Sequence, residues 1–281
     1  MKIGHLGPRG TFSEEAAVLY FEGEMQRIAY ATVPEVIEDV SIGALDAGII
    51  PLENTIEGSI NFTLDSLSDY ENVHMVGEYI LKVSLQLLGI PGASLSSIQE
   101  VWSISPAMAQ CFHFIRQIGA SRQFCESTAT AARLVKEAND TTKAAVASAF
   151  AAKEFGLTIL AKDIQDVAMN HTRFAVISKE PNYDVMANKT MLLIAPSKEQ
   201  AGMLANILQV FATLDLNLVW IESRPTKTRL GTYQFYMEVM VGHRDERLKK
   251  AIAILEILGN PVRVIGSYIG ACVSDIESFT V

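Results

Sequence analysis

The sequence predicts a mixed α/β protein in two parts: a two-lobed α/β region with a central cleft over residues 1–180, and a ferredoxin-like βαββαβ domain over residues 188–281. Three observations predict this fold class. Short apolar strands alternate with helical patterns in the first part, which is typical of parallel sheets covered by helices. A polar, proline-containing segment at 178–184 is typical of a linker. After it, the patterns follow the order strand, helix, strand, strand, helix, strand.

In the first part, six apolar runs are predicted strands, at residues 2–6, 27–31, 47–50, 121–124, 144–147 and 173–177. Six helical patterns separate or follow them, at residues 13–21, 34–41, 62–68, 107–118, 128–138 and 149–155. An extended segment at 76–85 and a return near 164–170 are predicted to cross between two lobes. The lobes would comprise about 1–77 with 167–180, and 78–166.

The second part carries four predicted strands, at 190–195, 216–223, 232–241 and 262–269. Its two predicted helices are 200–213 and 245–258. In the first of these helices Leu204, Ile207, Leu208 and Phe211 share one face, as a helix that packs on a sheet requires. The predicted domain is therefore a sheet covered by two amphipathic helices.

Composition excludes several classes of function. Hydrophobic residues make up 49% of the chain, and no apolar run is long enough to cross a bilayer. The net charge of −9 falls in the first part and no basic stripe interrupts it, so neither nucleic acid nor a membrane is an expected partner. The N-terminus has no signal-peptide pattern. The three cysteines, Cys111, Cys125 and Cys272, are odd in number and lack metal-ligand spacing, which predicts buried thiols in a reducing, cytoplasmic location. The five histidines are scattered without paired-ligand spacing, so no catalytic metal is expected.

Three segments place hydroxyls and amides where a strand ends. Thr11, Phe12 and Ser13 follow a glycine-proline turn at a helix start, where free backbone N–H groups attract a carboxylate or phosphate. Asn54 and Thr55 follow a buried strand, and the Ser127–Thr128 pair opens an alanine-rich helix. Each segment also has a purely structural interpretation as a capped turn or polar loop. Together, they predict a site for an anion with more than one carboxylate.

A fourth segment, 164–176, sets an amide, an imidazole, a hydroxyl and a guanidinium side by side just before the last strand of the first part. These are Asn170, His171, Thr172 and Arg173. A strand cannot bury all of them on one face, and Arg173 is suited to pair with a carboxylate. The alternative is an ordinary polar loop. In the second part, 202–204 and 222–225 are weaker candidates for a small-ligand site, because a structural helix start explains the first better.

Taken together, these segments resemble the prephenate dehydratase family across nearly the whole chain. The matching pieces are GPRGTFSEEAA at 7–17, PLENTIEGSI at 51–60, TLDSL at 63–67, STATAA at 127–132, AAVAS at 144–148, FGLTILAKDIQD at 155–166 and NHTRF at 170–174. GML at 202–204 and ESRP at 222–225 resemble the two phenylalanine-binding motifs of the family's ACT domain. The sequence departs from the family pattern at Ile104 and Pro106, where histidine and glutamine are usual.

The resemblance implies a periplasmic-binding-protein-like catalytic region and a C-terminal ACT regulatory domain. It implies a lyase of phenylalanine biosynthesis that converts prephenate to phenylpyruvate under allosteric control by L-phenylalanine, without a cofactor. Its implied catalytic residues are Thr172, Arg173 and Phe174, and its implied substrate-binding residues are Thr11, Phe12, Ser13, Asn54, Thr55, Ser127, Thr128 and Asn170. Its implied effector residues are Gly202, Met203, Leu204, Glu222, Ser223, Arg224 and Pro225.

Two alternatives stay open at this point. The first is arogenate dehydratase, which performs the same chemistry on the amino-acid analogue of prephenate. The second is a sensor without activity, because a two-lobed cleft beside an ACT domain is suited to bind ligands alone. Since an effector site between paired ACT domains needs two chains, the resemblance also implies a homodimer or homotetramer.

Overall fold

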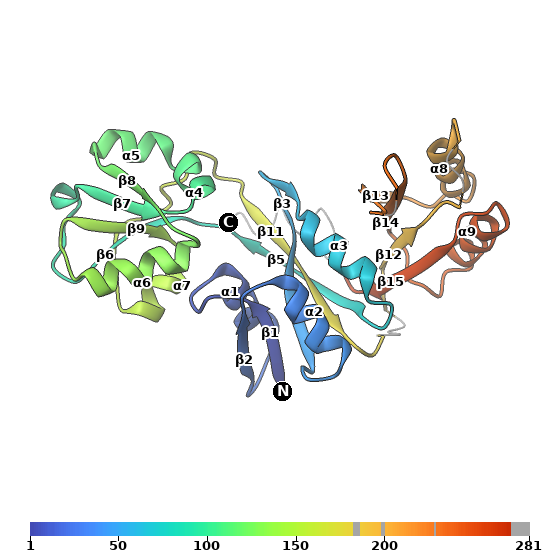
Figure 1. Cartoon of the computed structure of the whole chain (residues 1–281), viewed down its shortest axis with the longest axis horizontal. Helices are drawn as coiled ribbons and strands as arrows, with labels where there is room; N and C mark the ends of the chain where they lie inside the picture. The colour runs from blue at the N-terminus through green and yellow to red at the C-terminus, as the bar shows by residue number, and fades with distance from the viewer. Residues whose placement is uncertain (182–185, 198–199, 228, 271–281) are drawn as a thin grey trace. The chain divides into compact units, whose positions relative to one another are not determined.

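The computed structural model describes residues 1–181, 186–197, 200–227 and 229–270. Its fold is mixed α/β, as predicted, with three separate sheets (Figure 1). Residues 182–184 of the predicted linker, residues 271–281 of the predicted second domain and Cys272 lie outside the described residues.

A six-stranded sheet contains the first strands of the chain, in the order β2-β1-β3-β11-β5, with β4 paired to β3. Its strands are β1 (Lys2–Leu6), β2 (Gln26–Tyr30), β3 (Ala47–Asn54), β4 (Gly58–Ser59), β5 (His74–Lys82) and β11 (His171–Ser178). The helices of this region are α1 (Phe12–Tyr20), α2 (Val33–Ser41) and α3 (Asn61–Asp69). The first six residues of β3 are buried, as expected of a strand covered on both faces. Asn54 is the last residue of β3 and His171 is the first residue of β11, so both lie at strand ends.

A five-stranded sheet, in the order β10-β6-β9-β7-β8, is built entirely from the chain between β5 and β11. Its strands are β6 (Gln86–Gly89), β7 (Glu100–Ser103), β8 (Ser121–Phe124), β9 (Lys143–Ala147) and β10 (Thr158–Ala161). The helical segments here are η1 (Leu95–Ser97), α4 (Ser105–Gln110), α5 (Phe112–Ile118), α6 (Thr128–Ala138) and α7 (Ala149–Phe155).

Two sequence predictions in this region were wrong. The helix predicted at 107–118 is two helices, because Cys111 leaves helical geometry at φ −113° and ψ 25°. Strands β6, β7 and β10 were missed, although β8, which also has 4 residues, was predicted.

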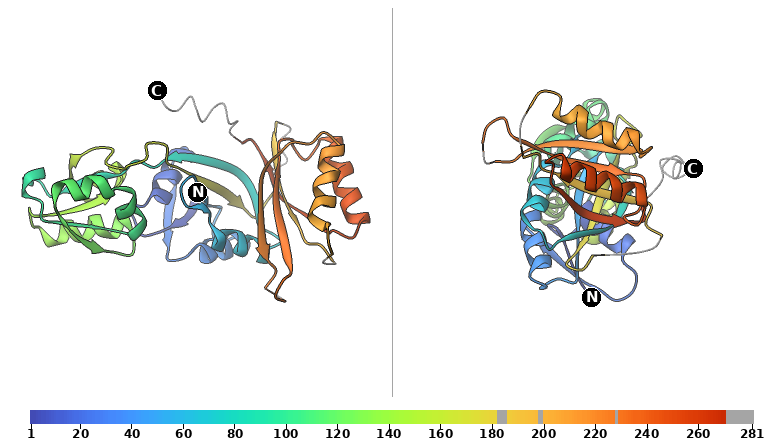
Figure 2. Two further views of the ribbon diagram at one scale, coloured as in Figure 1. Left: turned by 90° about the horizontal axis from the view of Figure 1, so that it is seen from above. Right: turned by 90° about the vertical axis from the view of Figure 1, so that its right-hand side faces the viewer.

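The last part has the predicted ferredoxin-like order. Its elements are β12 (Lys189–Ile194), α8 (Met203–Thr213), β13 (Leu218–Pro225), β14 (Tyr233–Val239), α9 (Glu246–Ile257) and β15 (Val262–Tyr268). The strands form an antiparallel sheet in the order β13-β14-β12-β15. Helices α8 and α9 cover one face of it (Figure 2), where Ile207, Phe211 and Leu248 pack against Leu192 and Met237. Helix α8 begins at Met203 rather than 200, because Gly202 precedes it in the left-handed region at φ 80°.

The chain divides into two compact units. The first comprises Met1–Val36, Glu53–Gly58 and Ile80–Phe174, and the second Ile37–Leu52, Ser59–Tyr79 and Ala175–Val281. The domain and lobe boundaries drawn from the sequence stay predictions. In the described part of the chain, no helix combines the length and apolarity that a bilayer crossing requires.

Within the second unit, β5 approaches the four-stranded sheet through a buried ionic cluster. The Lys189 Nζ lies 2.7 Å from Glu78 Oε1 and 3.9 Å from Glu238 Oε2, and the Tyr268 hydroxyl donates to Glu238. The two carboxylate side chains are 1% exposed and the lysine side chain 8%. Nearby, Gly266 lies so close to β5 that an added Cβ would come within 1.9 Å of the Met75 carbonyl oxygen. This packing joins β5 directly to the C-terminal sheet.

Candidate active site

Thr172 lies at the start of β11, and its hydroxyl oxygen accepts a hydrogen bond from Asn54 Nδ2 at 2.9 Å. The same amide nitrogen lies 2.9 Å from Asn170 Oδ1 and 3.1 Å from the His171 carbonyl oxygen. Among the hydrogen bonds of the described residues, none uses the Thr172 hydroxyl as a donor. The Asn54 amide therefore donates to the Thr172 oxygen, and the proton of the Thr172 hydroxyl is available to a ligand.

The turn after β3 fixes the orientation of Asn54. Its Oδ1 accepts from the backbone N–H groups of Ile56 at 2.9 Å and Glu57 at 3.1 Å, which forms an Asx-type turn. Because the oxygen is committed to this turn, Nδ2 must point toward Thr172. The two strand ends are also held together by Thr55, whose N–H donates to the His171 carbonyl at 2.9 Å and whose Oγ1 accepts from His171 N at 3.0 Å.

Asn170 is 1% exposed and completes a chain of amides around Thr172. Its Nδ2 donates to Gln110 Oε1 at 2.9 Å, and its carbonyl oxygen accepts from Val83 N at 2.8 Å. Gln110 Nε2 lies 3.4 Å from Glu57 Oε1. Gln110 was not among the predicted site residues, because α4 gives a single glutamine no distinguishing pattern. The available signal was that Gln110 lies only a few residues after Ile104 and Pro106, where the sequence departs from the family pattern.

Asn54→Asp should lower turnover by about 100-fold, within the range for removing one preorganised donor. The new carboxylate would keep the Asx turn. However, it would face the Asn170 and His171 oxygens without a proton to donate, and it would draw the Thr172 proton to itself. Steady-state kinetics on the purified variant measure the effect. Asn72→Asp is the matched control, since it makes the same charge change where Asn72 Nδ2 donates to Ser41 O at 2.9 Å. Equal losses in both variants would contradict the assignment.

The two residues after Thr172 are placed differently from each other. Arg173 Nη1 lies 3.8 Å from Glu53 Oε2, and its side chain is 11% exposed. Phe174 is 1% exposed, so in this conformation almost none of its ring can reach a ligand. Its predicted contact with a substrate ring stays a prediction.

The first predicted segment is held by its own hydrogen bonds. The Thr11 hydroxyl donates to the Leu6 carbonyl at 2.9 Å and accepts from Glu14 N at 3.3 Å, which makes it the N-cap of α1. Glu14 Oε2 accepts from Gly10 N at 2.7 Å, and Ser13 is buried. Phe12 packs against the core of the five-stranded sheet. The Thr11 hydroxyl therefore already donates one hydrogen bond and accepts another within the turn between β1 and α1.

A cavity of about 600 Å³ joins the first predicted segment to the third. It is lined by Gly7, Pro8, Arg9, Ala29, Tyr30, Ala31, Glu126, Ser127, Thr130 and Arg133. Ser127 caps α6, since its Oγ accepts from Thr130 N at 2.9 Å. Thr128 is buried beside it. The cavity combines a helix N-terminus with two guanidinium groups, but both are paired, Arg9 with Glu154 and Arg133 with Glu137, and the Glu126 carboxylate also lines it.

The predicted substrate residues therefore fall into two groups. Asn54 hydrogen-bonds to Thr172 directly, Thr55 bonds to the adjacent His171 backbone and Asn170 bonds to Asn54, whereas Ser127 lines the cavity. Thr11, Phe12, Ser13 and Thr128 flank that cavity in sequence without being part of its lining. Ile104, at the position where the family usually has histidine, packs against the core of the five-stranded sheet.

His171 and Glu15 are two of the first unit's titratable groups whose pKa values are shifted from their ordinary values. Burial lowers the pKa of His171, and the positive charge of Lys82 lowers it further, so the ring is neutral near neutral pH. His171 Nε2 has no hydrogen-bond partner in the part of the chain that the structure describes. Burial raises the pKa of Glu15 to about 7, but no hydrogen bond or ion pair given above connects it to Thr172. Within the described ranges, no group of three or more His, Cys, Asp or Glu side chains is arranged to hold a metal ion.

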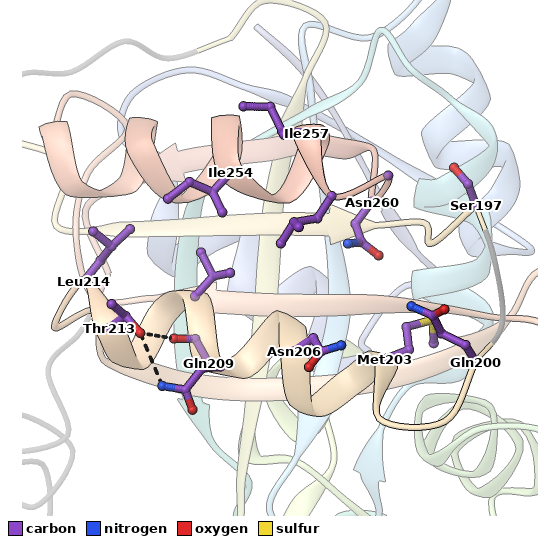
Figure 3. Close-up of a pocket in the computed structure, with 13 residues that line it drawn as sticks. Ser197, Gln200, Met203, Asn206, Gln209, Thr213, Leu214, Ile254, Ile257 and Asn260 are labelled. Carbon is purple, nitrogen blue, oxygen red and sulfur yellow. Dashed lines mark hydrogen bonds between the residues drawn. The ribbon is translucent and has the colours of Figure 1, made fainter.

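The predicted effector residues lie on α8 and β13. Gly202 is the N-cap of α8, and Met203 and Leu204 form its first turn. On β13, Ser223 and Pro225 are exposed, whereas Glu222 and Arg224 are half-buried. The helix face also carries an uncharged cavity of about 640 Å³ between the two helices (Figure 3). Among the predicted effector residues, only Met203 is part of its lining.

The family profile and the similar curated proteins point to the same family. A profile of the family described as "Prephenate dehydratase" matches residues 3–182. The prephenate dehydratase of Bacillus subtilis (strain 168) is 35% identical over 280 residues, which cover 95% of this chain and 98% of that protein. The solved structure of the Staphylococcus aureus subsp. aureus Mu50 prephenate dehydratase is 36% identical with a TM-score of 0.85, covering 95% of this chain and 100% of that one.

A further solved relative carries a ligand. The prephenate dehydratase from Arthrobacter aurescens, in complex with L-Phe, is 32% identical with a TM-score of 0.88 and covers 96% of this chain and 90% of that one. The profile matches residues 3–182, and the Bacillus subtilis and Staphylococcus aureus relatives each cover 95% of the chain. This chain therefore belongs to the prephenate dehydratase family.

Proposed function

We propose that this protein catalyses the decarboxylating dehydration of prephenate to phenylpyruvate, with Thr172 acting on the departing ring hydroxyl. The observation that carries the assignment is the Asn54–Thr172 hydrogen bond of 2.9 Å, which leaves the threonine proton free to donate. Family membership supports the reaction class, a carbon–oxygen lyase acting on prephenate.

The chemistry needs positioning more than a strong acid. As the bond to the ring carboxylate breaks, its electron pair enters the ring, carbon dioxide leaves, and the ring hydroxyl departs with its electron pair. Aromatisation supplies the driving force. A threonine hydroxyl is a weak acid, so Thr172 polarises the leaving oxygen by a hydrogen bond rather than by complete prior proton transfer. Preorganised dipoles aimed at developing charge suit this step.

The remaining site residues hold the substrate in this proposal. Asn54, Thr55 and Asn170 fix Thr172, and Arg173 orients the loop or a carboxylate. Ser127, Thr128 and the turn at Thr11–Ser13 offer hydroxyls and helix N-termini to the carboxylates. Phe174 serves as an apolar support for the ring.

Turnover of prephenate by the purified protein tests this function, with arogenate assayed side by side. Phenylpyruvate formation above the spontaneous rate is expected with prephenate. Turnover of arogenate in preference to prephenate would favour the amino-acid analogue. Binding of prephenate without turnover would favour a sensor and refute the enzymatic proposal.

We also propose that the C-terminal βαββαβ domain is an ACT domain that binds L-phenylalanine and regulates the reaction allosterically. The L-Phe complex of the Arthrobacter aurescens relative supports this assignment. The proposed effector residues are Gly202, Met203, Leu204, Glu222, Ser223, Arg224 and Pro225. Because the ligand would lie between paired domains, the proposal includes a homodimer or homotetramer. It also includes a cytoplasmic location, which rests on the cysteine pattern.

Gly202→Leu should lower the affinity for L-phenylalanine by at least about tenfold, equivalent to roughly 1.4 kcal/mol. The side chain would cover the N-terminus of α8, where free N–H groups would meet the ligand. Isothermal titration calorimetry measures the affinity. Gly23→Leu is the matched control, because Gly23 has φ 81° against 80° at Gly202 and also has open space around an added Cβ. An unchanged affinity in folded Gly202→Leu would count against this site.

A further inference from the structure

The ESRP segment on β13 presents alternate side chains to opposite faces of the C-terminal sheet. Glu222 pairs in register with Tyr236, and Ser223 with Phe235. Phe235 belongs to the core under α8 and α9, whereas the Tyr236 hydroxyl donates to the Leu64 carbonyl of α3 at 2.6 Å. Since paired residues point to the same face, Ser223 shares the helix face and Glu222 the α3 face. The period of two places Arg224 with Glu222.

The two side chains on the α3 face make specific contacts outside the C-terminal domain. Arg224 binds Asp65 on α3 bidentately, with Nε–Oδ1 of 2.8 Å and Nη2–Oδ2 of 3.0 Å. Both side chains are largely buried, at 15% and 17% exposure, and the guanidinium holds the pKa of Asp65 below its usual range. Ser59 donates to Glu222 Oε2 at 2.7 Å. A partly buried, bidentate pair of this kind is far more directional than a surface ion pair.

The contacted residues are close in sequence to the active-site turn. Ser59 forms β4, which pairs with β3, and Ile60 N donates to the Leu52 carbonyl at 2.9 Å. That hairpin carries Asn54, five positions before Ser59, whose amide holds Thr172. Helix α3 is also held at its end, where Arg263 donates to the Ser68 carbonyl at 3.0 Å and to that of Leu67. Movement of β13 would therefore be transmitted to the hairpin that orients the site.

We propose that the ESRP segment has two roles. Ser223 and Pro225 face the effector. Glu222 and Arg224 transmit effector binding to the active-site hairpin through their contacts with Ser59 and Asp65. This inference rests on the proposed regulation by L-phenylalanine. Within the proposed effector site, Ser223 and Pro225 would then contact the amino acid, whereas Glu222 and Arg224 belong to the site as positioning residues. In this scheme, L-phenylalanine biases the hairpin because the Arg224–Asp65 and Glu222–Ser59 contacts differ between the liganded and unliganded states.

Asp65→Asn separates transmission from binding. Calorimetry should give an L-phenylalanine affinity close to that of the wild type, and turnover without effector should be retained. In the wild type, L-phenylalanine should change the affinity for prephenate by about 5–150-fold, the usual range of allosteric coupling, and in Asp65→Asn this change should fall below about twofold. By reciprocity, prephenate should no longer alter the L-phenylalanine affinity. If this variant fails to fold, Ser59→Ala makes the same test by deleting only a hydroxyl.

Glu246→Gln is the control, because it removes a carboxylate from a pair with Lys249 inside α9 alone. It should bind and respond as the wild type does. A wild-type response in Asp65→Asn would overturn the inference, and so would loss of L-phenylalanine binding in that variant. A wild-type protein that binds no L-phenylalanine would instead refute the proposed regulation, and this inference with it.

Discussion

Thr172→Ala is expected to lose about 100–1000-fold in turnover, the usual cost of removing a group aimed at charge that develops in the transition state. The half-buried hydroxyl is held by Asn54 Nδ2 at 2.9 Å, so no reorganisation is needed when the substrate hydroxyl begins to depart. Since the interaction strengthens only as the bond breaks, kcat should fall far more than KM rises.

Thr172→Ser separates the hydroxyl from the methyl group and should retain most of the turnover. Circular dichroism and a thermal melt show whether Thr172→Ala is folded. A double variant with Asn54→Asp should lose little beyond the larger single loss, because both changes disable the same hydroxyl. Full turnover by folded Thr172→Ala would eliminate this residue as the group acting on the substrate.

Lys189→Met is expected to cost about 3–5 kcal/mol in the free energy of unfolding, because removing one partner leaves uncompensated charge in the interior. The lysine ammonium lies 2.7 Å from Glu78 and 3.9 Å from Glu238, and both carboxylate side chains are 1% exposed. Methionine fills a similar volume, so loss of packing contributes little. Urea denaturation followed by circular dichroism measures the change.

Two variants control this experiment. Lys249→Met removes a lysine from an exposed pair with Glu246 and should change stability little. Adding Glu78→Gln to Lys189→Met should recover part of the loss, since one of the stranded charges is then neutral. A Lys189→Met protein as stable as the wild type would show that water or protonation compensates the buried carboxylates.

Much of the fold could be read from local patterns. Alternation of strands and helices predicted the α/β class, and the order of patterns after residue 188 predicted the ferredoxin-like sheet. The N-cap residues Thr11 and Ser127 were recognisable because capping depends on neighbours three positions away. Strand β7 escaped, because its sequence, Glu100–Ser103, has only two apolar residues, Val101 and Trp102.

The sequence pointed to Asn54 and Thr172 separately, by their motifs. The Asn54 amide binds the Thr172 hydroxyl although the two residues lie 118 positions apart. This contact depends on how the ends of β3 and β11 are placed together, which no local pattern encodes. The same holds for Gln110, 60 positions from Asn170, and for Lys189, 111 positions from Glu78. Side-chain chemistry and spacing are properties of the chain, whereas which groups meet depends on how buried strands and helices pack, and packing is a property of the whole molecule.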